Sequence, residues 1–432
     1  MRQSPADPLE NRTSVWYNIP MNRIFFHVDV NNAYLSWEAA HRLQHGESLD
    51  LRTIPSIIGG DPKTRRGIVL AKSQPAKAFG IRTGESLREA LQKCPTLYIA
   101  TPNYRLYHAC SQALRTIFDR YTPLVQPFSI DESFLDMSHV TDPVGVAYAM
   151  KEQIWSELGF TVNIGISTNK LLAKIASDFR KPFRVHTLFP TEIPEKLWPL
   201  PVRELYMVGP ASEKSLQAMG IRTVGDLAKA HPEELVHKLK SYGAMIHQFA
   251  HGIEASEISE RTAQDAKGIG NSTTLPADIS DAKTVRLYLL AIAESVASRL
   301  RAIDKMAWVV TVHAKDTKLK VRSHQRKLLS PIDNTTALYQ TAVELFDQLW
   351  NGYPLRHLGI RVTDLVDNDK FAMDLFTMAR IDKTRTLDAT IDKLRERFGD
   401  QAIQRASFAN QSIKPMIGGI GDEKELTLGS EL

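Results

Sequence analysis

The sequence predicts an α+β protein made of several domains. Its 432 residues suffice for about three or four domains of ordinary size. Hydrophobic residues make up 43% of the chain and charged residues 24%, a composition typical of globular proteins. Strand-like and helical patterns mix up to residue 188, short helical patterns alone follow over 193–252, and a second mixed region covers 267–366. We therefore expect a helical domain between two mixed domains.

The first mixed region has the pattern of a buried sheet with covering helices. Strands are predicted over 24–30, 66–72 and 160–167, and two β-like runs meet near residue 131. Helices are predicted over 31–43, 75–95, 104–121, 143–158 and 169–179. The first helix begins at Asn31 or Asn32, because asparagine is a frequent N-cap residue. The last helix ends before Lys181, since Pro182 disfavours helix at the preceding residue.

The second mixed region and the chain ends complete the pattern. Helices are predicted over 283–301 and 335–350, and strands over 307–314, 319–324 and 355–365. The polar segment 253–266 is a predicted linker. Residues 1–20 and 367–432 are polar, and we expect them to form terminal tails.

Charge, cysteine content and hydrophobic runs indicate which partners and which cellular compartment the protein could have. The net charge of +5 and the pI of about 9.0 permit a nucleic-acid partner without proving one. Cys94 and Cys110 form neither a metal-type spacing nor a disulfide framework, which fits a reducing compartment. The first twenty residues lack a signal-peptide core, and no apolar run has the length of a membrane span. We expect a cytoplasmic protein without a membrane segment and, because nothing indicates an oligomer, a monomer.

Three acidic residues form the candidate catalytic centre. Asp131 and Glu132 are adjacent in S-I-D-E-S-F-L-D, and Asp29 lies near the end of the first predicted strand. A hairpin turn or bulge over 130–133 would break the strand alternation and let both neighbours reach one site. Converging carboxylates repel one another unless a cation lies among them, and oxygen-only ligands favour Mg²⁺ or Mn²⁺, which in pairs promote phosphoryl transfer. Spacing alone leaves open the alternative of a solvated turn.

Four segments resemble, in order and spacing, those of a known family. They are F-H-V-D-V-N-N-A-Y, A-K-S-Q-P-A-K-A-F-G-I-R, S-I-D-E-S-F-L-D and N-I-G-I-S-T-N-K-L-L-A-K-I-A-S-D-F-R-K-P. The family is the Y-family DNA polymerases, and the bacterial DNA polymerase IV branch is the most similar. The resemblance covers residues 23–363, most of the chain.

The resemblance implies a right-hand polymerase with palm, fingers, thumb and little finger. The implied boundaries are palm 21–39 and 96–188, fingers 40–95, thumb 189–252, linker 253–266, little finger 267–366 and C-terminal tail 367–432. The implied reaction is template-directed addition of dNTPs to the primer 3′ end of primer–template DNA, with release of pyrophosphate. Such enzymes perform low-fidelity translesion synthesis in DNA repair or damage tolerance.

The matching positions imply the residues of the active site. Asp29, Asp131 and Glu132, with the carbonyl of Val30, would bind two Mg²⁺ ions, with Mn²⁺ as an alternative. Tyr34 matches the steric gate, whose ring leaves no room for a ribose 2′-hydroxyl. A core aromatic residue on an amphipathic helix is the alternative for Tyr34.

Positions matching the dNTP-binding residues depart in part from the family pattern. Lys181 and Lys77 match basic residues that grip the triphosphate, although a lone lysine is more often plain surface charge. Lys77 stands in place of an arginine, and Gln74 stands in place of a tyrosine. Asn31 stands where many relatives have a second aspartate, and the loss of that charge changes the electrostatic field at the metals. We expect these departures to raise the KM for dNTP. Lys174 would support the fold or neutralise nearby acids.

A basic segment late in the chain is the candidate DNA contact. Basic or potentially basic residues occupy every second position, at Lys318, Lys320, Arg322, His324 and Arg326. On one strand these side chains would share a face along the DNA phosphates, with Leu319 and Val321 turned to the core. A solvated edge strand guarded by lysines is the alternative.

Two further motifs are partial matches. The stretch Y-M-V-G-P-A-S-E-K resembles a helix-hairpin-helix in which Gly209 would help to hold a DNA phosphate, and a simple turn between helices fits equally well. The stretch F-A-M-D-L-F in the tail resembles a peptide that holds the sliding clamp. Its implied clamp-binding residues are Met373, Asp374, Leu375 and Phe376. Docking of these residues on the chain's own surface, or their inclusion in a helix, is the alternative.

Two other functions are weighed against an active polymerase. The first is a catalytically weak or inactive DNA-binding scaffold of the same family, which the presence of all three acids disfavours. The second is another two-metal enzyme, such as a nuclease or a nucleotide cyclase. Tyr34, the two lysines and the basic segment argue against it.

Overall fold

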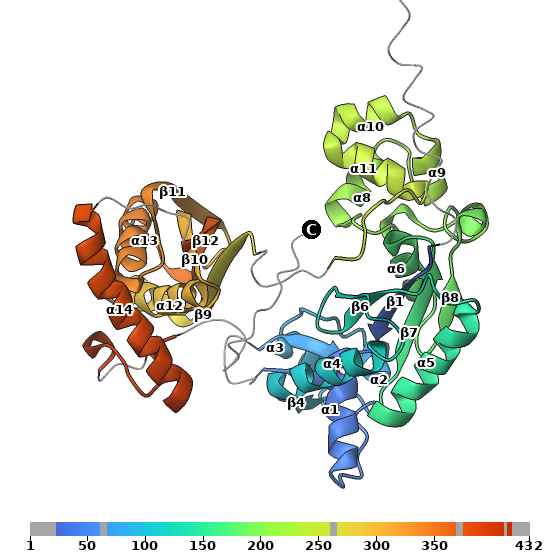
Figure 1. The fold of residues 1–432 in the computed structure, drawn as a ribbon, viewed down its shortest axis with the longest axis horizontal. Coiled ribbons are helices and arrows are strands. Elements are labelled where there is room, and N and C mark those ends of the chain that lie inside the picture. The colour runs from blue at the N-terminus through green and yellow to red at the C-terminus, as the bar shows by residue number, and fades with distance from the viewer. Residues whose placement is uncertain (1–22, 61–66, 260–265, 369–374, 410–412, 417–432) are drawn as a thin grey trace, which may run out of the picture. The chain divides into compact units, whose positions relative to one another are not determined.

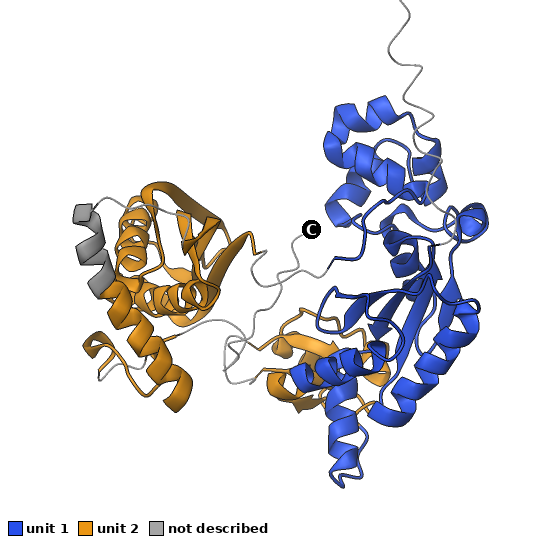
Figure 2. Cartoon of the chain, viewed as in Figure 1, with its two compact units in different colours: residues 1–50, 107–260 blue, residues 51–106, 261–432 orange. Residues whose placement is uncertain are grey.

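The structure consists of two compact units. It is a computed structural model that describes residues 23–60, 67–259, 266–368, 375–409 and 413–416. Unit 1 contains residues 1–50 and 107–260, and unit 2 contains residues 51–106 and 261–432 (Figure 2). All three acids of the predicted catalytic centre belong to unit 1.

Unit 1 is built on a five-stranded sheet with the order β5-β6-β1-β7-β8. Its strands are β1 (Phe25–Val30), β5 (Val125–Pro127), β6 (Glu132–Asp136), β7 (Val162–Ser167) and β8 (Val185–Thr187). Neighbouring strands are antiparallel, except that β7 and β8 are parallel. Strands β1 and β7 are buried along their whole length, as their apolar character predicts. The register places Asp29 between Glu132 on β6 and Asn163 on β7.

Helix α6 lies close against the central strands of this sheet. The longer helices of the region are α1 (Ala33–Gln44), α4 (Tyr104–Phe118), α5 (Pro143–Leu158) and α6 (Lys170–Asp178) (Figure 1). A Cβ atom at Gly165 of β7 would lie 1.9 Å from the carbonyl oxygen of Ala173, so glycine permits the close approach of α6. Ser177 of α6 contacts His27 of β1, so α6 covers the face that also carries Asp29.

Short helices follow the sheet, as the sequence predicts. They are the 3₁₀ turns η1 (Pro190–Glu192) and η2 (Val202–Glu204) and the helices α7 (Ile193–Lys196), α8 (Pro210–Gln217), α9 (Val224–Lys229), α10 (Pro232–Leu239) and α11 (Ser241–Ala250). Their shared core includes Leu197, Val224 and Ile246. The described residues of the predicted linker, 253–259 and 266, have no regular structure. The stretch 253–259 is held to α6, since Lys170 Nζ donates a 2.8 Å hydrogen bond to the carbonyl of Glu257.

Unit 2 begins with a three-stranded sheet in the order β3-β2-β4. Its elements are β2 (Ser56–Gly59), β3 (Val69–Lys72), α2 (Gln74–Ala78), α3 (Leu87–Lys93) and β4 (Tyr98–Ala100). The sequence predicts one mainly helical stretch over 75–95, but the structure has two short helices there. Gly80 and Gly84 have φ angles of 74° and 85°, and these left-handed positions form the connection that separates the helices.

A second sheet of unit 2 has four antiparallel strands in the order β11-β10-β12-β9. Its strands are β9 (Gly268–Ile279), β10 (Lys305–Asp316), β11 (Val321–Ile332) and β12 (Leu355–Asp367), and its core includes side chains of α12 (Ala282–Ala302) and α13 (Thr335–Leu349). The sequence analysis missed β9. Two of its buried residues, Asn271 and Thr273, are polar and interrupt the apolar alternation.

The segment 367–432, predicted as a polar tail, contains a docked helix instead. Helix α14 (Leu375–Phe398) packs on α12. The buried carboxylate of Glu294 on α12 forms ion pairs with Arg395 at 3.3 Å and with Arg405 at 2.9 Å. The prediction was wrong here because charged residues that look solvated in the sequence are paired and buried in the fold. Residues 1–22, which include the predicted N-terminal tail, lie outside the described residues.

Candidate active site

The three predicted acids lie at one end of the central strands of unit 1. Asp29 is the penultimate residue of β1 and pairs in register with Glu132, the first residue of β6. Asp131 lies in a bend over 129–131 that precedes β6, and its carbonyl accepts a 3.1 Å hydrogen bond from the N–H of Val30. The bend breaks the strand alternation, as predicted, so the two adjacent acids both lie beside Asp29.

Each acid has a partner of its own. Glu132 Oε2 forms an ion pair of 2.9 Å with Lys174 Nζ, and Asp29 forms an ion pair with Lys181. Asp131 accepts a hydrogen bond of 2.5 Å from the hydroxyl of the serine two residues before it. Among the described residues, no three His, Cys, Asp or Glu side chains gather as a metal-binding group in this arrangement. The positive charge beside the acids comes from the two lysines.

The acids nevertheless act on one another electrostatically. Burial, with the charges of Glu132 and Asp131, raises the pKa of Asp29 to about 6 despite the neighbouring ammonium group. Burial and the charge of Glu132 also raise the pKa of Asp131. Burial alone would raise the pKa of Glu132, but His27 and Lys174 outweigh it and lower that pKa to about 2. Three mutually repelling oxygen donors are the ligand set that a hard divalent cation neutralises, so these residues fit such an ion.

His27 supports this site and was not singled out from the sequence. Its buried ring has Nδ1 2.8 Å from Ser177 Oγ and Nε2 3.8 Å from Glu132 Oε2. The second distance is too long for a hydrogen bond, so the shorter contact of Lys174 is the one that holds Glu132. Burial lowers the pKa of His27. The available signal was a single polar residue within the apolar run F-F-H-V before Asp29.

Tyr34, the predicted steric gate, belongs to an aromatic stack. It lies in the first turn of α1, half-buried. Its ring stacks on Tyr107 of α4 with centroids 4.6 Å apart and planes 11° apart, and it lies 6.0 Å from the ring of Trp37. The stack fixes the orientation of the Tyr34 ring, which lies only a few residues from Asp29 in the sequence. This arrangement is compatible with a steric gate and with a core aromatic residue.

Lys181 lies beside the acids, where a triphosphate contact is expected. It follows α6 and pairs with Asp29 and, at 2.8 Å, with Asp178. Burial lowers the pKa of Lys181, but the charges of the two aspartates outweigh this and raise it. Lys181 is therefore a firmly protonated cation at the acid cluster.

The five basic residues predicted as a DNA contact do not form one ladder. Lys318 and Lys320 lie in the turn over 317–320, and β11 begins only at Val321. Asp316 Oδ1 accepts hydrogen bonds of 2.9 Å from the N–H groups of both lysines, which fixes the turn. The prediction of a single strand through all five positions is therefore wrong.

The remaining three basic residues lie on the face opposite to the predicted one. In register with these three residues on β10 lie core residues, so Arg322, His324 and Arg326 face the helix-covered side. The register partners are Ala314, Val312 and Val310. Accordingly, Arg326 pairs with Glu344 of α13 at 2.6 Å, and Arg322 pairs with Asp316 at 3.1 Å. Leu319 and Val321, predicted to face the core, are 62% and 55% exposed.

The other face of this sheet carries a polar surface that the sequence analysis missed. We call it the open face and define it by His313, Lys315, Lys327 and His357. His313 and Lys315 alternate with the core residues of β10. His357 lies in register with Lys315, and Lys327 lies in register with Val309 of the same face. The two histidine rings stack at 5.9 Å, and Gly359 leaves room for them, since a Cβ there would lie 2.2 Å from the ring of His313. Burial, with the charges of His313 and Lys315, lowers the pKa of His357 to about 4.

Comparison with known proteins decides the family. The chain matches the impB/mucB/samB family over residues 28–178, the family's HHH motif over 190–221 and its C-terminal domain over 266–375. It is 40% identical to the DNA polymerase IV of Clostridium acetobutylicum, over 91% of this chain and 100% of that protein. It is 38% identical to the DNA polymerase IV of Acetivibrio thermocellus, over 89% of this chain and 97% of that protein. The chain belongs to the Y family of DNA polymerases.

The fold agrees with that of solved Y-family structures. The Y-family DNA polymerase chimera Dbh-Dpo4(243-245)-Dbh superposes with a TM-score of 0.70 at 21% identity, over 80% of this chain and 100% of that chain. DinB from Sulfolobus solfataricus gives a TM-score of 0.52, also at 21% identity, over the same shares of the two chains. The predicted α+β polymerase fold and the predicted family are thus confirmed.

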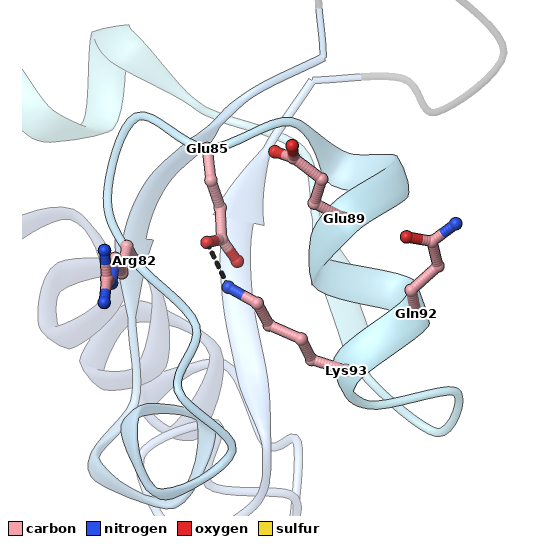
Figure 3. Close-up of a pocket in the computed structure, with 5 residues that line it drawn as sticks. All are labelled: Arg82, Glu85, Glu89, Gln92 and Lys93. Carbon is pink, nitrogen blue, oxygen red and sulfur yellow. Dashed lines mark hydrogen bonds and ion pairs between the residues drawn. The ribbon is translucent and has the colours of Figure 1, made fainter.

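Two predicted dNTP contacts of this Y-family chain lie in unit 2. Gln74 is the first residue of α2 and Lys77 lies one turn later, and both are exposed. A hollow of about 470 Å³ in the same sheet region is lined by Arg82, Glu85, Glu89, Gln92 and Lys93 (Figure 3). Its charges are largely satisfied internally: Lys93 bonds Glu85 at 2.5 Å, and Glu89 completes the capping box of α3. We assign no function to this hollow.

The two partial motifs remain predictions for this Y-family polymerase. Gly209 is the N-cap of α8, where Pro210 occupies the first helical position and leaves one N–H fewer for a phosphate. Met373 and Asp374 lie outside the described residues. Leu375 and Phe376 open α14, and the structure does not describe their side chains.

Proposed function

We propose that this Y-family DNA polymerase transfers nucleotides at the site formed by Asp29, Asp131 and Glu132. Its DNA-directed polymerase activity in translesion synthesis, expected from the sequence, is confirmed by its relatives. The observation that carries the site assignment is the position of three carboxylates at one end of the central strands. Burial and the charge of Glu132 raise the pKa values of the other two.

Divalent cations complete this site in our proposal. Enzymes of this family need such ions, and we assign two Mg²⁺ ions, with Mn²⁺ as an alternative, to the three carboxylates and the carbonyl of Val30. When bound, such ions help to activate the primer 3′-hydroxyl and neutralise charge on the phosphates of the dNTP. The proposed ligands are all oxygen atoms, which hard cations prefer to nitrogen or sulfur.

The two lysines have different roles in our proposal. Lys174 contacts Glu132 from α6, and with His27 it favours the ionised form of that carboxylate. The side chain of Lys181 is 35% exposed, so its ammonium can exchange Asp29 for the oxygens of an incoming triphosphate. Gln74 and Lys77 are proposed as further, weaker triphosphate contacts.

The polymerase acts on primer–template DNA and dNTP, and we propose how each is recognised. Tyr34 excludes the ribose 2′-hydroxyl, with its ring held by the stack on Tyr107. DNA phosphates lie along the open face, which replaces the predicted ladder because strand alternation turns Lys315 and Lys327 outward. The turn residues Lys318 and Lys320 and the backbone at Gly209 are proposed as additional phosphate contacts.

Partners beyond the substrates are proposed on the sequence motifs alone. We propose that the segment from Met373 to Phe376 binds the sliding clamp, that the enzyme acts as a monomer, and that it works in the cytoplasm. Among the described residues, no helix combines the length and the apolar character needed to cross a membrane.

Primer extension on a templated duplex tests the site assignment. Wild type is expected to extend the primer with dNTPs and Mg²⁺ or Mn²⁺, and Asp131→Ala and Glu132→Ala are expected to abolish extension while binding DNA as wild type does. Extension by both variants at the wild-type rate would place the chemistry elsewhere. A wild type that binds DNA but extends with neither metal would instead favour the scaffold function.

A further inference from the structure

Asn31 and Asn163 form a buried amide pair next to the acids. Asn31 follows β1 and is 6% exposed, and Asn163 of β7 is completely buried opposite Asp29. Asn31 Nδ2 donates a hydrogen bond of 3.3 Å to Asn163 Oδ1. The position at which this chain departs from the family's aspartate is therefore bonded to β7 and not to the acids.

Backbone groups fix the orientation of the Asn163 amide. Its Nδ2 donates to the carbonyl oxygens of Ser177 at 3.0 Å and Arg180 at 2.9 Å, and these oxygens can only accept. Its Oδ1 accepts from the N–H of Arg184 at 3.1 Å, which can only donate. The oxygen of Asn163 must therefore face Asn31, and residue 31 must supply a donor.

The other end of the Asn31 amide holds the segment that carries Lys181. Asn31 Oδ1 accepts a hydrogen bond of 2.8 Å from the N–H of Phe183. Phe183 has a φ of 58°, a left-handed conformation disfavoured for residues other than glycine, so it persists only where its surroundings hold it. Its ring also lies over Lys151, with Nζ 3.6 Å from the ring centroid.

We infer that Asn31 is a positioning residue for Lys181. The amide pair holds the backbone of Arg180, Phe183 and Arg184, on both sides of Lys181. The segment is thereby fixed so that the Lys181 ammonium lies at the acid cluster and is ready for the triphosphate. This inference rests on the proposed function, in which Lys181 binds the triphosphate, and it gives Asn31 a role unrelated to the field at the metals.

Aspartate cannot take over this role in the present chain. An aspartate at position 31 still accepts from Phe183, but it has no donor for Asn163, whose amide is locked. It also buries another negative charge beside Asp29, whose pKa is already raised. Restoring the residue common in relatives should therefore loosen the 180–184 segment and not repair it.

Hydrogen exchange tests the structural part of the inference without any need for activity. We expect Asn31→Ala, which removes the acceptor of Phe183, to speed exchange of the Phe183 and Arg184 amides about tenfold, the effect of losing one hydrogen bond. Asn31→Asp keeps that acceptor but leaves Asn163 without its donor, and it should speed exchange of the Arg184 amide. Asn32→Asp is the matched control, because Asn32 is exposed, caps nothing with its side chain and adds the same charge one residue away. Unchanged exchange in both Asn31 variants, or equal acceleration in Asn32→Asp, would overturn the inference.

A double-mutant cycle on full-length enzyme tests the link to dNTP binding. Lys181→Ala and Asn31→Ala are each expected to raise the KM for dNTP about tenfold with a much smaller effect on kcat. Because Asn31 acts through Lys181, the double variant should have the KM of Lys181→Ala alone. Two effects that multiply, or an unchanged KM in Asn31→Ala, would overturn the positioning role.

The two tests separate this inference from the function on which it rests. A KM unchanged in Lys181→Ala would remove Lys181 from triphosphate binding and thereby overturn the role of Asn31 in catalysis. Faster exchange in Asn31→Ala together with that result would show a purely structural amide pair. Asn31→Asp keeps the size of the side chain, so the tests still apply if Asn31→Ala folds poorly.

Discussion

Glu132 and Asp29 are register partners with very different acidities. The pKa of Glu132 is lowered to about 2, whereas that of Asp29 is raised to about 6. Asp29 is buried, Glu132 is half-buried, and both contact a lysine. Burial outweighs the lysine at Asp29, whereas His27 and Lys174 together outweigh burial at Glu132. At the scale of residues, the site thus holds one carboxylate that is ionised at neutral pH and one whose ionised form an added cation would stabilise further.

Tyr34 is expected to select the sugar of the incoming nucleotide. Tyr34→Ala should lower the preference for dNTP over rNTP, measured as the ratio of kcat/KM values, by roughly tenfold or more, because the ring no longer fills the space of a 2′-hydroxyl. Tyr34→Phe keeps the ring on Tyr107 and should keep the preference. Equal preference in wild type and Tyr34→Ala would leave Tyr34 as a core aromatic residue only.

Gln74 and Lys77 are expected to weaken dNTP binding relative to the residues common in the family. The double change Gln74→Tyr with Lys77→Arg should lower the KM for dNTP about tenfold, since it restores a hydroxyl donor and a bidentate fork. Steady-state primer extension with varied dNTP measures this KM. A KM unchanged by the double change would show that α2 does not contact the triphosphate.

Strand register decides which basic residues of β11 face outward. The alternating sequence from 318 to 326 predicted five basic side chains on one face. A turn over 317–320 removes two of them from the strand, and pairing with core residues of β10 turns the other three to the helix-covered face. A one-residue difference in register exchanges the two faces of a strand completely. At the scale of elements, Lys327 is therefore the better candidate for a phosphate contact than Arg326.

The salt dependence of DNA binding distinguishes these two residues. Lys327→Ala should flatten the slope of log K against log salt by roughly 0.9, the effect of one lost phosphate contact. Arg326→Ala is the matched control on the same strand, and it should leave the slope unchanged because Arg326 pairs with Glu344 of α13. A flatter slope in Arg326→Ala with an unchanged slope in Lys327→Ala would show that DNA contacts the face of Arg326, as the sequence predicted.

The sequence predicted the acidic residues of the candidate active site more completely than it predicted the surrounding fold. Asp131 and Glu132 were found because a bend between apolar runs is a local signal, and Asp29 because it lies near the end of a buried strand. The burial of Asn271 in β9 and of Arg395 in α14 had no local signal, since both depend on partners distant in sequence. Polar residues that are buried through tertiary partners are the ones that pattern reasoning misses.

At the scale of the whole molecule, buried ion pairs attach the C-terminal helix to the rest of unit 2. Arg395→Ala would leave Glu294 buried with one partner fewer, and we expect it to destabilise α12 and α14 by about 3–5 kcal/mol. Arg286→Ala is the matched control, because its pair with Asp347 is 45% exposed on both sides and should contribute at most about 1 kcal/mol. Hydrogen exchange of the α12 amides measures the destabilisation caused by each variant. Equal destabilisation by Arg395→Ala and Arg286→Ala would show that the buried ion pairs do not hold α14.

The central claim is that the three carboxylates of unit 1 hold the cations of the polymerase reaction. Mn²⁺ binding to the full chain, with a chain-terminated primer–template and dNTP, tests it most directly by electron paramagnetic resonance. We expect wild type to bind two ions per protein and Glu132→Gln to bind fewer. Asp136→Asn, a carboxylate change on the same strand away from the site, should bind as wild type does. Equal Mn²⁺ binding by Glu132→Gln and wild type would contradict the claim.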